Sequence, residues 1–160
     1  MIVSVLNKII KSGGKYICIS RPRRFGKTIA ANIISSYYSK GCDSRELFSK
    51  CKISKDESFN SYLNKLNVIK LDVNSEYRNA LDKQNLILRL TRNIRDEFIQ
   101  QFPELKFYDD FSVADCISKV FEATGEKFII LMDEYDVLVR ENVGDSLFTQ
   151  YLDFLTNTQS

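Results

Sequence analysis

The sequence predicts an α/β fold in which helices cover a mostly parallel sheet. Two short apolar runs, Tyr16 to Ile19 and Phe128 to Met132, have the composition of strands that are covered on both faces. Between them lies at least one long amphipathic segment, Leu86 to Phe98, whose apolar residues step by four. Strands that alternate with helices are typical of right-handed parallel connections, and such sheets bind ligands at the carboxyl ends of their strands.

Length and composition favour one globular domain over residues 1–160, since the chain has 160 residues and is 44% hydrophobic. The formal net charge of +2 creates no strong field for nucleic acid or membrane. No apolar run approaches the ~18 residues of a membrane span, so we expect a cytoplasmic protein with no membrane partner. Histidine is absent and the four cysteines lie far apart, which argues against zinc and excludes a Ser-His triad.

The first elements follow from periodicity and glycines. A helix should begin near Ile2 and end at Gly13-Gly14, and a strand should cover Lys15 to Ser20. A turn, Arg21 to Gly26, then leads into a helix from Lys27 to about Tyr38. The expected core face of that helix is Ile29, Ile33, Ile34, Tyr37 and Tyr38.

Residues 43–66 look like a small helical insertion. Asp43 with Glu46 reads as one helix start, and a second short helix should cover Glu57 to Leu66. Val68 to Val73 carries enough β-branched residues to be the second strand, and Asn74 to Glu76 reads as a turn.

The second half begins with the long helix, which Pro103 should end. Ser112 with Asp115 predicts the cap of the next helix, and Gly125 predicts its end. Strand three is Phe128 to Met132, and the last helix runs from Asp145 to about Phe154. The expected core face of the capped helix is Val113, Ile117, Val120 and Phe121.

The segment Ser20 to Thr28 has the pattern of a phosphate-binding loop between a buried strand and a helix. In that interpretation Gly26 lets the backbone approach an anion, Lys27 reaches the β and γ phosphates, and Thr28 binds magnesium. A Gly-Lys-Ser/Thr triplet also arises by chance in roughly one such chain in ten, and the alternative is an ordinary helix start. The predicted nucleotide-contacting residues are Arg21, Pro22, Arg23, Arg24, Phe25, Gly26, Lys27, Thr28 and Ile29.

The arginines of this loop have two interpretations. Arg21 stands where the G-x-x-x-x-G-K-[ST] pattern has its first glycine. Arg21, Arg23 and Arg24 could contact phosphate oxygens or a neighbouring subunit, because guanidinium groups suit bidentate anion contacts. They could equally form a solvated basic turn, which Pro22 would stiffen in either case.

Acidic residues follow the third strand directly. Asp133 suits a role in the magnesium shell, and Glu134 could act as the catalytic residue that polarises the attacking water while Lys27 neutralises phosphate charge. Asp136 is either an outer-shell partner or a turn cap. The alternative for the whole segment is a buried strand that ends in a polar turn.

The nucleotide base is less well defined. Tyr16, Phe25, Tyr37, Tyr38 and Phe107 are aromatic residues that could stack on a base, although a core position is simpler for most of them. The guanine-reading N-K-x-D pattern is not completed at residues 64–67, so ATP is favoured.

Two motifs together resemble the AAA-ATPase-like family, whose members share an R-P-R-R-F-G-K-[ST] loop and a D-E-Y-D segment. Here they stand at Ser20 to Thr28 and Leu131 to Asp136, and the resemblance extends to Gly41–Phe48 and Val68–Val73. It implies a three-layer P-loop NTPase core, with phosphate at Gly26 and Lys27 and water activation by Glu134. The implied magnesium ligands are Thr28 and Asp133.

The resemblance also implies features beyond this sequence. Many members continue into a C-terminal PD-(D/E)XK nuclease-like domain, and a fourth strand with a polar sensor separates the two motif-bearing strands. Only three strands are predicted here, so we expect an N-terminal, incomplete part of the domain. The expected function is magnesium-dependent ATP hydrolysis that drives a conformational switch of the attached domain. Alternatives are a regulatory scaffold that binds nucleotide without turnover, with a protein or oligomeric partner, and an ATP-regulated module of a nuclease-associated protein.

Overall fold

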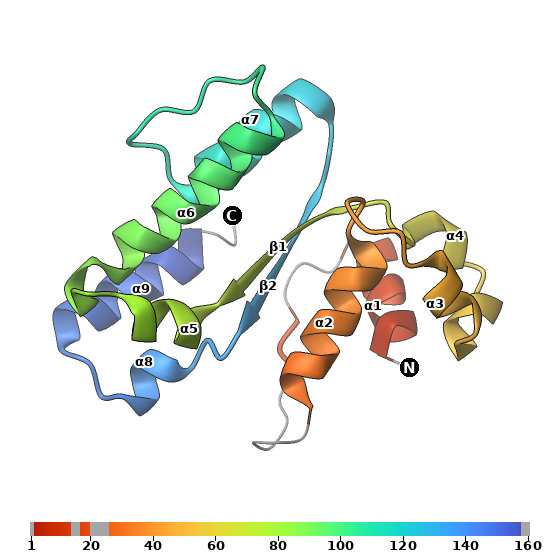
Figure 1. The fold of residues 1–160 in the computed structure, drawn as a ribbon, viewed down its shortest axis with the longest axis horizontal. Helices are drawn as coiled ribbons and strands as arrows, with labels where there is room; N and C mark the ends of the chain where they lie inside the picture. The colour runs from red at the N-terminus through yellow and green to blue at the C-terminus, as the bar shows by residue number, and fades with distance from the viewer. Residues whose placement is uncertain (1, 14–16, 20–25, 158–160) are drawn as a thin grey trace. The chain divides into compact units, whose positions relative to one another are not determined.

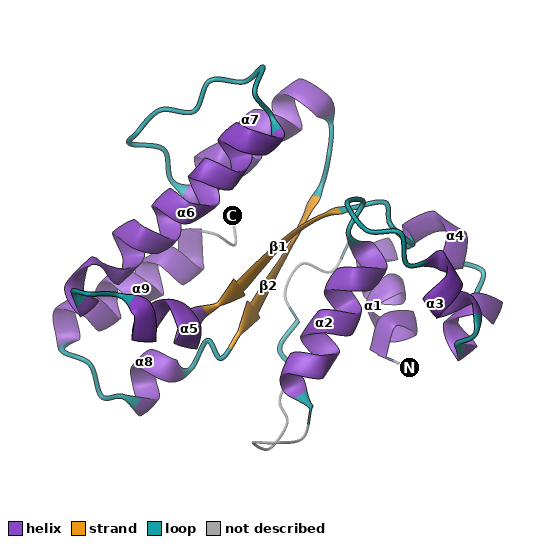
Figure 2. Cartoon of the chain, viewed as in Figure 1, coloured by secondary structure: helices purple, strands orange, loops and turns teal. Residues whose placement is uncertain are grey.

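The computed structural model describes residues 2–13, 17–19 and 26–157, and these residues divide into two compact units. Unit 1 comprises Met1–Lys70 with Lys127–Asp133, and unit 2 comprises Leu71–Glu126 with Glu134–Ser160. The strands are β1 (Asn67–Asp72) and β2 (Phe128–Asp133), and the helices follow the order shown in Figures 1 and 2. The prediction of one domain over residues 1–160 stays a prediction.

Unit 1 is built around the packing of α1 (Ile2–Lys11) on α2 (Lys27–Tyr38). The insertion contributes α3 (Arg45–Ser49), the 3-10 helix η1 (Lys52–Lys55) and α4 (Phe59–Tyr62). Helix α4 is shorter than the predicted Glu57 to Leu66 and begins later, and η1 was not predicted. The shared apolar core consists of Val3, Leu6, Ile34, Tyr37, Tyr38, Phe48, Ile53, Phe59 and Leu63.

The sheet described by the structure has two parallel strands, β1 and β2 (Figure 2). Ile129 and Leu131 of β2 pack against the core of unit 1, as the alternation of a strand requires. The predicted first strand is not confirmed where it can be checked, because Ile17 to Ile19 have no regular secondary structure. Lys15, Tyr16 and Ser20 lie outside the described residues.

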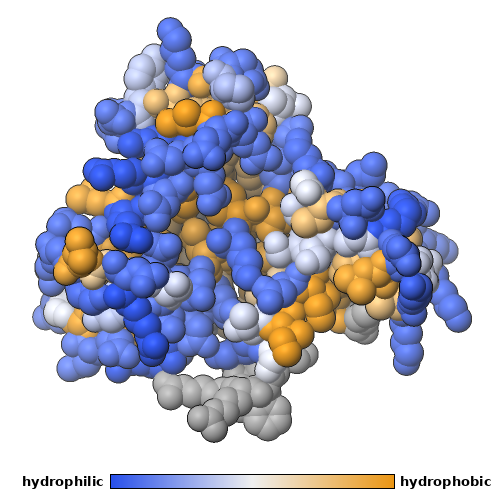
Figure 3. Space-filling model, in the orientation of Figure 1, coloured by the Kyte–Doolittle hydropathy of each residue, from blue (hydrophilic) through white to orange (hydrophobic). Residues whose placement is uncertain are grey.

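The buried face of α2 differs from the predicted one. Ala30, Ile34, Tyr37 and Tyr38 are buried, whereas Ile29 is 65% exposed. Ile33 is exposed as well, and Figure 3 shows hydrophobic surface over this helix. Apolar residues at spacings of three and four can mark either side of a helical stripe, so periodicity alone did not fix which side packs.

Unit 2 is assembled on α6 (Leu86–Gln101), which contacts α5 (Val73–Asn79), α7 (Val113–Thr124) and α9 (Asp145–Asn157). The residues predicted to step by four along α6 are all buried. The predicted cap of α7 is confirmed as a reciprocal capping box between Ser112 and Asp115. Phe121 is the exception to the predicted face of α7, since it is 50% exposed and Cys116 is buried.

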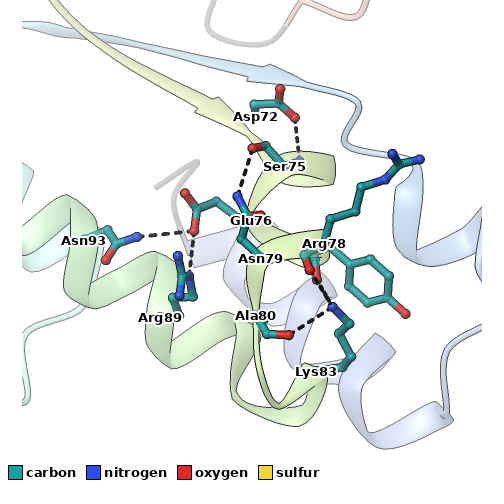
Figure 4. Close-up of polar contacts among 10 residues, drawn as sticks. Asp72, Ser75, Glu76, Arg78, Asn79, Ala80, Lys83, Arg89 and Asn93 are labelled. Carbon is teal, nitrogen blue, oxygen red and sulfur yellow. Dashed lines mark hydrogen bonds and ion pairs between the residues drawn. The ribbon is translucent and has the colours of Figure 1, made fainter.

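A helix replaces the turn predicted after the second strand (Figure 4). The carboxylate of Asp72 accepts a hydrogen bond of 2.9 Å from the backbone N–H of Ser75, which caps the start of α5. At the other end, the ammonium of Lys83 donates to the carbonyls of Tyr77, Arg78 and Ala80. Both ends of a short helix are thereby satisfied, which explains why a turn-like sequence is helical.

The last elements are η2 (Lys83–Asn85), which precedes α6, and α8 (Val137–Arg140), which follows β2. Between α5 and α6, Glu76 accepts a hydrogen bond from Arg89 at 2.9 Å and one from Asn93 at 3.3 Å (Figure 4). Among the described residues, no helix is both long and apolar enough to cross a bilayer.

Candidate functional site

The start of α2 carries the described part of the predicted phosphate loop. Gly26 has φ 75°, in the left-handed region, and its carbonyl accepts from the N–H of Ala30 at 2.9 Å. Lys27 and Thr28 are the first residues of the helix, with Lys27 partly buried and Thr28 exposed. Arg21 to Phe25, including Pro22, Arg23 and Arg24, lie outside the described residues.

The electrostatics at this helix end favour an anion. The first turn of α2 contains no acidic residue, and its first residue is Lys27. The N–H groups of the first turn and the dipole of a twelve-residue helix add partial positive charge at the same end. Ile29 is exposed there too, so it belongs to the surface around this helix end.

The carboxylate of Asp133 belongs to the same unit. Asp133 is the last residue of β2 and is only 8% exposed. Helix α2 contacts β2 and runs in the opposite direction, so its N-terminal end lies toward the carboxyl end of the strand (Figure 1). Within unit 1, the helix end that carries Lys27 and Thr28 thus faces the same way as the strand end that carries Asp133.

Glu134 begins unit 2 and has a special backbone. Its φ of 52° is left-handed, which is uncommon for a residue with a side chain. Its carbonyl accepts from the N–H of Val137 at 3.1 Å, which leads directly into α8. A left-handed residue turns the chain sharply, so the strand ends at Asp133. The conformation of this turn therefore sets the direction in which the Glu134 side chain leaves the backbone.

Arg140 is the site residue that the sequence analysis missed. Its Nη2 lies 2.8 Å from Oε2 of Glu134, and its Nε lies 3.6 Å from Oδ2 of Asp136. Asp136 occupies the N-cap of α8 but makes no side-chain cap bond, so the predicted turn cap is not formed. The contact between Asp136 and Arg140 could have been predicted, because oppositely charged residues four apart in a helix often pair. The contact to Glu134 depends on the turn and had no such signal.

The aromatic residues considered for base stacking are mostly structural. Tyr37 and Tyr38 are fully buried in the core of unit 1, and burial raises the pKa of both hydroxyls. Phe107 packs against Phe98 with ring centroids 5.7 Å apart. Tyr16 and Phe25 lie outside the described residues.

One comparison with known proteins is positive. A family model described as predicted AAA-ATPase matches residues 4–158. The chain belongs to the predicted AAA-ATPase family. No curated protein and no solved structure matches it.

The region that matches the AAA-ATPase-like family contains both the start of α2 and the acidic residues at the end of β2. The matched range includes Lys27, Thr28, Asp133, Glu134 and Arg140. At a general level the family indicates nucleotide binding.

Proposed function

We propose that this chain binds ATP together with magnesium at a P-loop NTPase core and hydrolyses the γ-phosphate. The observation that carries the proposal is the packing of α2 on β2 within unit 1. This packing supports a site in which a lysine-bearing helix N-terminus and a buried carboxylate act together. Phosphate and a divalent cation are the ligands that such a pair of groups suits.

The donor groups fit magnesium. The hydroxyl of Thr28 is on an exposed residue of the first turn, and Asp133 supplies a carboxylate, so both offer hard oxygen ligands. Magnesium usually takes one or two protein ligands and completes its shell with water and phosphate. The described residues contain no group of three or more His, Cys, Asp or Glu that could hold a metal alone. When bound, the ion would neutralise phosphate charge.

The residues of the chain then have distinct tasks. The N–H groups at the start of α2 and the ammonium of Lys27 bind the phosphate oxygens and stabilise charge there. Glu134 orients a water molecule and accepts its proton as the water oxygen bonds to the γ-phosphorus. The bond from that phosphorus to the β–γ bridging oxygen breaks, and ADP and inorganic phosphate leave.

Binding of a fluorescent ATP analogue with magnesium tests the first half of the proposal. We expect binding by the chain, loss of at least tenfold in affinity in Lys27→Ala, and near-normal affinity in Glu134→Gln. Lys65→Ala is the matched control, because Lys65 is an exposed lysine outside the site. A folded chain that binds no analogue, or a Lys27→Ala variant that binds as tightly, would contradict the assignment.

A second candidate function is nucleotide binding without turnover, in a regulatory scaffold. The ion pair between Glu134 and Arg140 is the observation on which the two functions differ, since it either occupies the carboxylate or orients it toward water. Release of inorganic phosphate by the chain, lost in Glu134→Gln, would exclude this alternative. Binding with no phosphate release would establish it and overturn hydrolysis. A conformational switch, an attached C-terminal domain and a protein or oligomeric partner stay predictions.

A further inference from the structure

We propose that Arg140 is a positioning residue, which holds the carboxylate of Glu134 in the orientation needed to direct the attacking water. This inference rests on the proposed hydrolysis and adds a residue to it. Arg140 is assigned this role by its contacts within unit 2 and by the geometry of the turn after β2.

The contact between the two side chains is close and partly shielded from water. Nη2 of Arg140 lies 2.8 Å from Oε2 of Glu134, and each side chain is 25% exposed. A charge-assisted hydrogen bond in such a setting is screened less than a surface ion pair. The contact therefore restrains a side chain that has three rotatable bonds.

The arginine is itself held in place. Val137 and Leu138 of α8 are buried, with exposed fractions of 0% and 1%, so this short helix is anchored in the core of unit 2. The backbone N–H of Arg140 donates to the carbonyl of Asp136 at 3.1 Å. Asp136 also places a carboxylate oxygen, Oδ2, 3.6 Å from Nε. Arg140 thus stands on a rigid support rather than on a loop, as a group that sets an orientation must.

The backbone of the turn is restrained from a second direction. The hydroxyl of Tyr151 in α9 donates a hydrogen bond of 2.6 Å to the carbonyl of Tyr135, next to Glu134. The left-handed conformation of Glu134 is unfavourable for a residue with a side chain, so surrounding contacts must maintain it. Backbone and side chain of one residue are therefore both fixed.

One nitrogen of the guanidinium, Nε, can donate a further hydrogen bond. Nε of Arg140 is buried and makes no hydrogen bond among the described residues. At 3.6 Å, Asp136 is just beyond hydrogen-bond distance from it. A small shift of Asp136 would satisfy this donor and leave Nη2 on Glu134, so the guanidinium can retain both carboxylates at once.

The test is steady-state and single-turnover ATP hydrolysis, measured in parallel with analogue binding. The variants are Arg140→Met, Arg140→Lys, Glu134→Ala and the double variant of Arg140→Met with Glu134→Ala. Arg92→Met is the matched control, since Arg92 is an exposed arginine on α6. Circular dichroism and urea unfolding verify that each variant is folded.

Arg140→Met should lower kcat at least tenfold while KM and analogue affinity change less than twofold. Arg140→Lys should recover part of kcat, because an ammonium can still reach a carboxylate but not as a fork. In the Glu134→Ala background, Arg140→Met should change the residual rate less than twofold, since Arg140 acts through Glu134.

Any of four outcomes would overturn the inference. Unchanged kcat in Arg140→Met would show that the contact does not matter for the reaction. A further fall in the double variant, or a rise of KM in step with the fall of kcat, would assign Arg140 a structural or binding role. A chain that binds magnesium and ATP but releases no phosphate would overturn this inference and leave ATP binding standing. Loss of analogue binding by the unmodified chain would instead overturn the proposed function.

Discussion

The hydroxyl of Tyr38 donates a hydrogen bond of 2.7 Å to Oδ1 of Asn7, which joins α2 to α1 inside the core of unit 1. Asn7 is 1% exposed, and its Nδ2 donates to the hydroxyl of Ser58 at 2.8 Å and to that of Tyr37 at 3.3 Å. The Tyr37 hydroxyl donates in turn to the carbonyl of Phe59 at 3.2 Å. A buried amide with these partners links two helices to the insertion that follows them.

Asn7→Leu should therefore destabilise unit 1 although it adds an apolar residue to an apolar core. It leaves the Tyr38 hydroxyl without its acceptor, and an unsatisfied buried group costs about 1–3 kcal/mol. Tyr38→Phe should cost less, about 1 kcal/mol, because it removes only one hydrogen bond. Urea unfolding measures both, with the exposed Lys11→Ala as control. Equal stability of Asn7→Leu and the unmodified chain would contradict this interpretation of the network.

Substitutions of Asn64 should lower the free energy of unfolding by an amount that depends on the new residue. Its φ is 55°, and its Nδ2 donates to the carbonyls of Ser36 at 3.1 Å and Ser39 at 3.0 Å. Asn64→Gly loses these hydrogen bonds but still adopts the left-handed backbone without strain. Asn64→Ala loses the same hydrogen bonds and is also strained in that conformation. We expect Asn64→Ala to be less stable than Asn64→Gly by about 1 kcal/mol. The difference in urea midpoint at equal m-value measures this, and no difference would mean that the backbone relaxes.

The cap of α7 should make stability depend on pH. The hydroxyl and then the backbone N–H of Ser112 hold the pKa of Asp115 below its ordinary value of 3.8. A lowered carboxyl pKa stabilises the fold above the unfolded-state pKa, and this contribution is lost as pH falls through the folded-state value. Asp115→Asn should thus be less stable than the unmodified chain at neutral pH, and the gap should close in acid. Asp110→Asn, at an exposed position, should show no such pH-dependent gap. A gap that is constant with pH would contradict the linkage.

Cys116 should be the slowest described cysteine to alkylate in the folded chain. Burial raises the pKa of its thiol to about 11 from an ordinary value of 9.0, although the charge of Arg95 opposes the rise. At mildly alkaline pH, a rise of about two units means roughly a hundredfold less thiolate, which is the reactive form. Cys18 and Cys42 are exposed. Mass spectrometry after brief iodoacetamide treatment should find these two modified first. Early labelling of Cys116 would indicate frequent opening of the α6–α7 pair.

The sequence predicted best the elements whose signals are local. Helix α6 has apolar residues at every fourth position, and α7 has a cap that two neighbouring residues form by themselves. Strand β2 is the most apolar run of the chain and was placed to within one residue. The prediction failed where structure depends on distant partners. Helix α5 needs Lys83 beyond its end, and the buried side of α2 depends on α1 and the insertion.

The candidate site shows the same division. Lys27 and Thr28 were chosen from a strand–turn–helix pattern, and Asp133 and Glu134 because they directly follow an apolar strand. The described elements place the first pair at a helix start and the second pair where a strand ends. Arg140 could not be found in this way. Its contact with Glu134 exists only because a left-handed residue and a four-residue helix turn the chain back on itself.

The hydrogen bond from Tyr151 to Tyr135 sets a practical limit on shortening this chain. A truncation that ends before α9 would remove no residue with a predicted chemical task. It would nevertheless withdraw the hydroxyl donor beside Glu134, along with the buried side chains of Leu147 and Tyr151. The smallest segment able to carry the acidic half of the site thus extends well past the D-E-Y-D motif. Expression trials that stop at the motif would be expected to yield an inactive protein for reasons unrelated to chemistry.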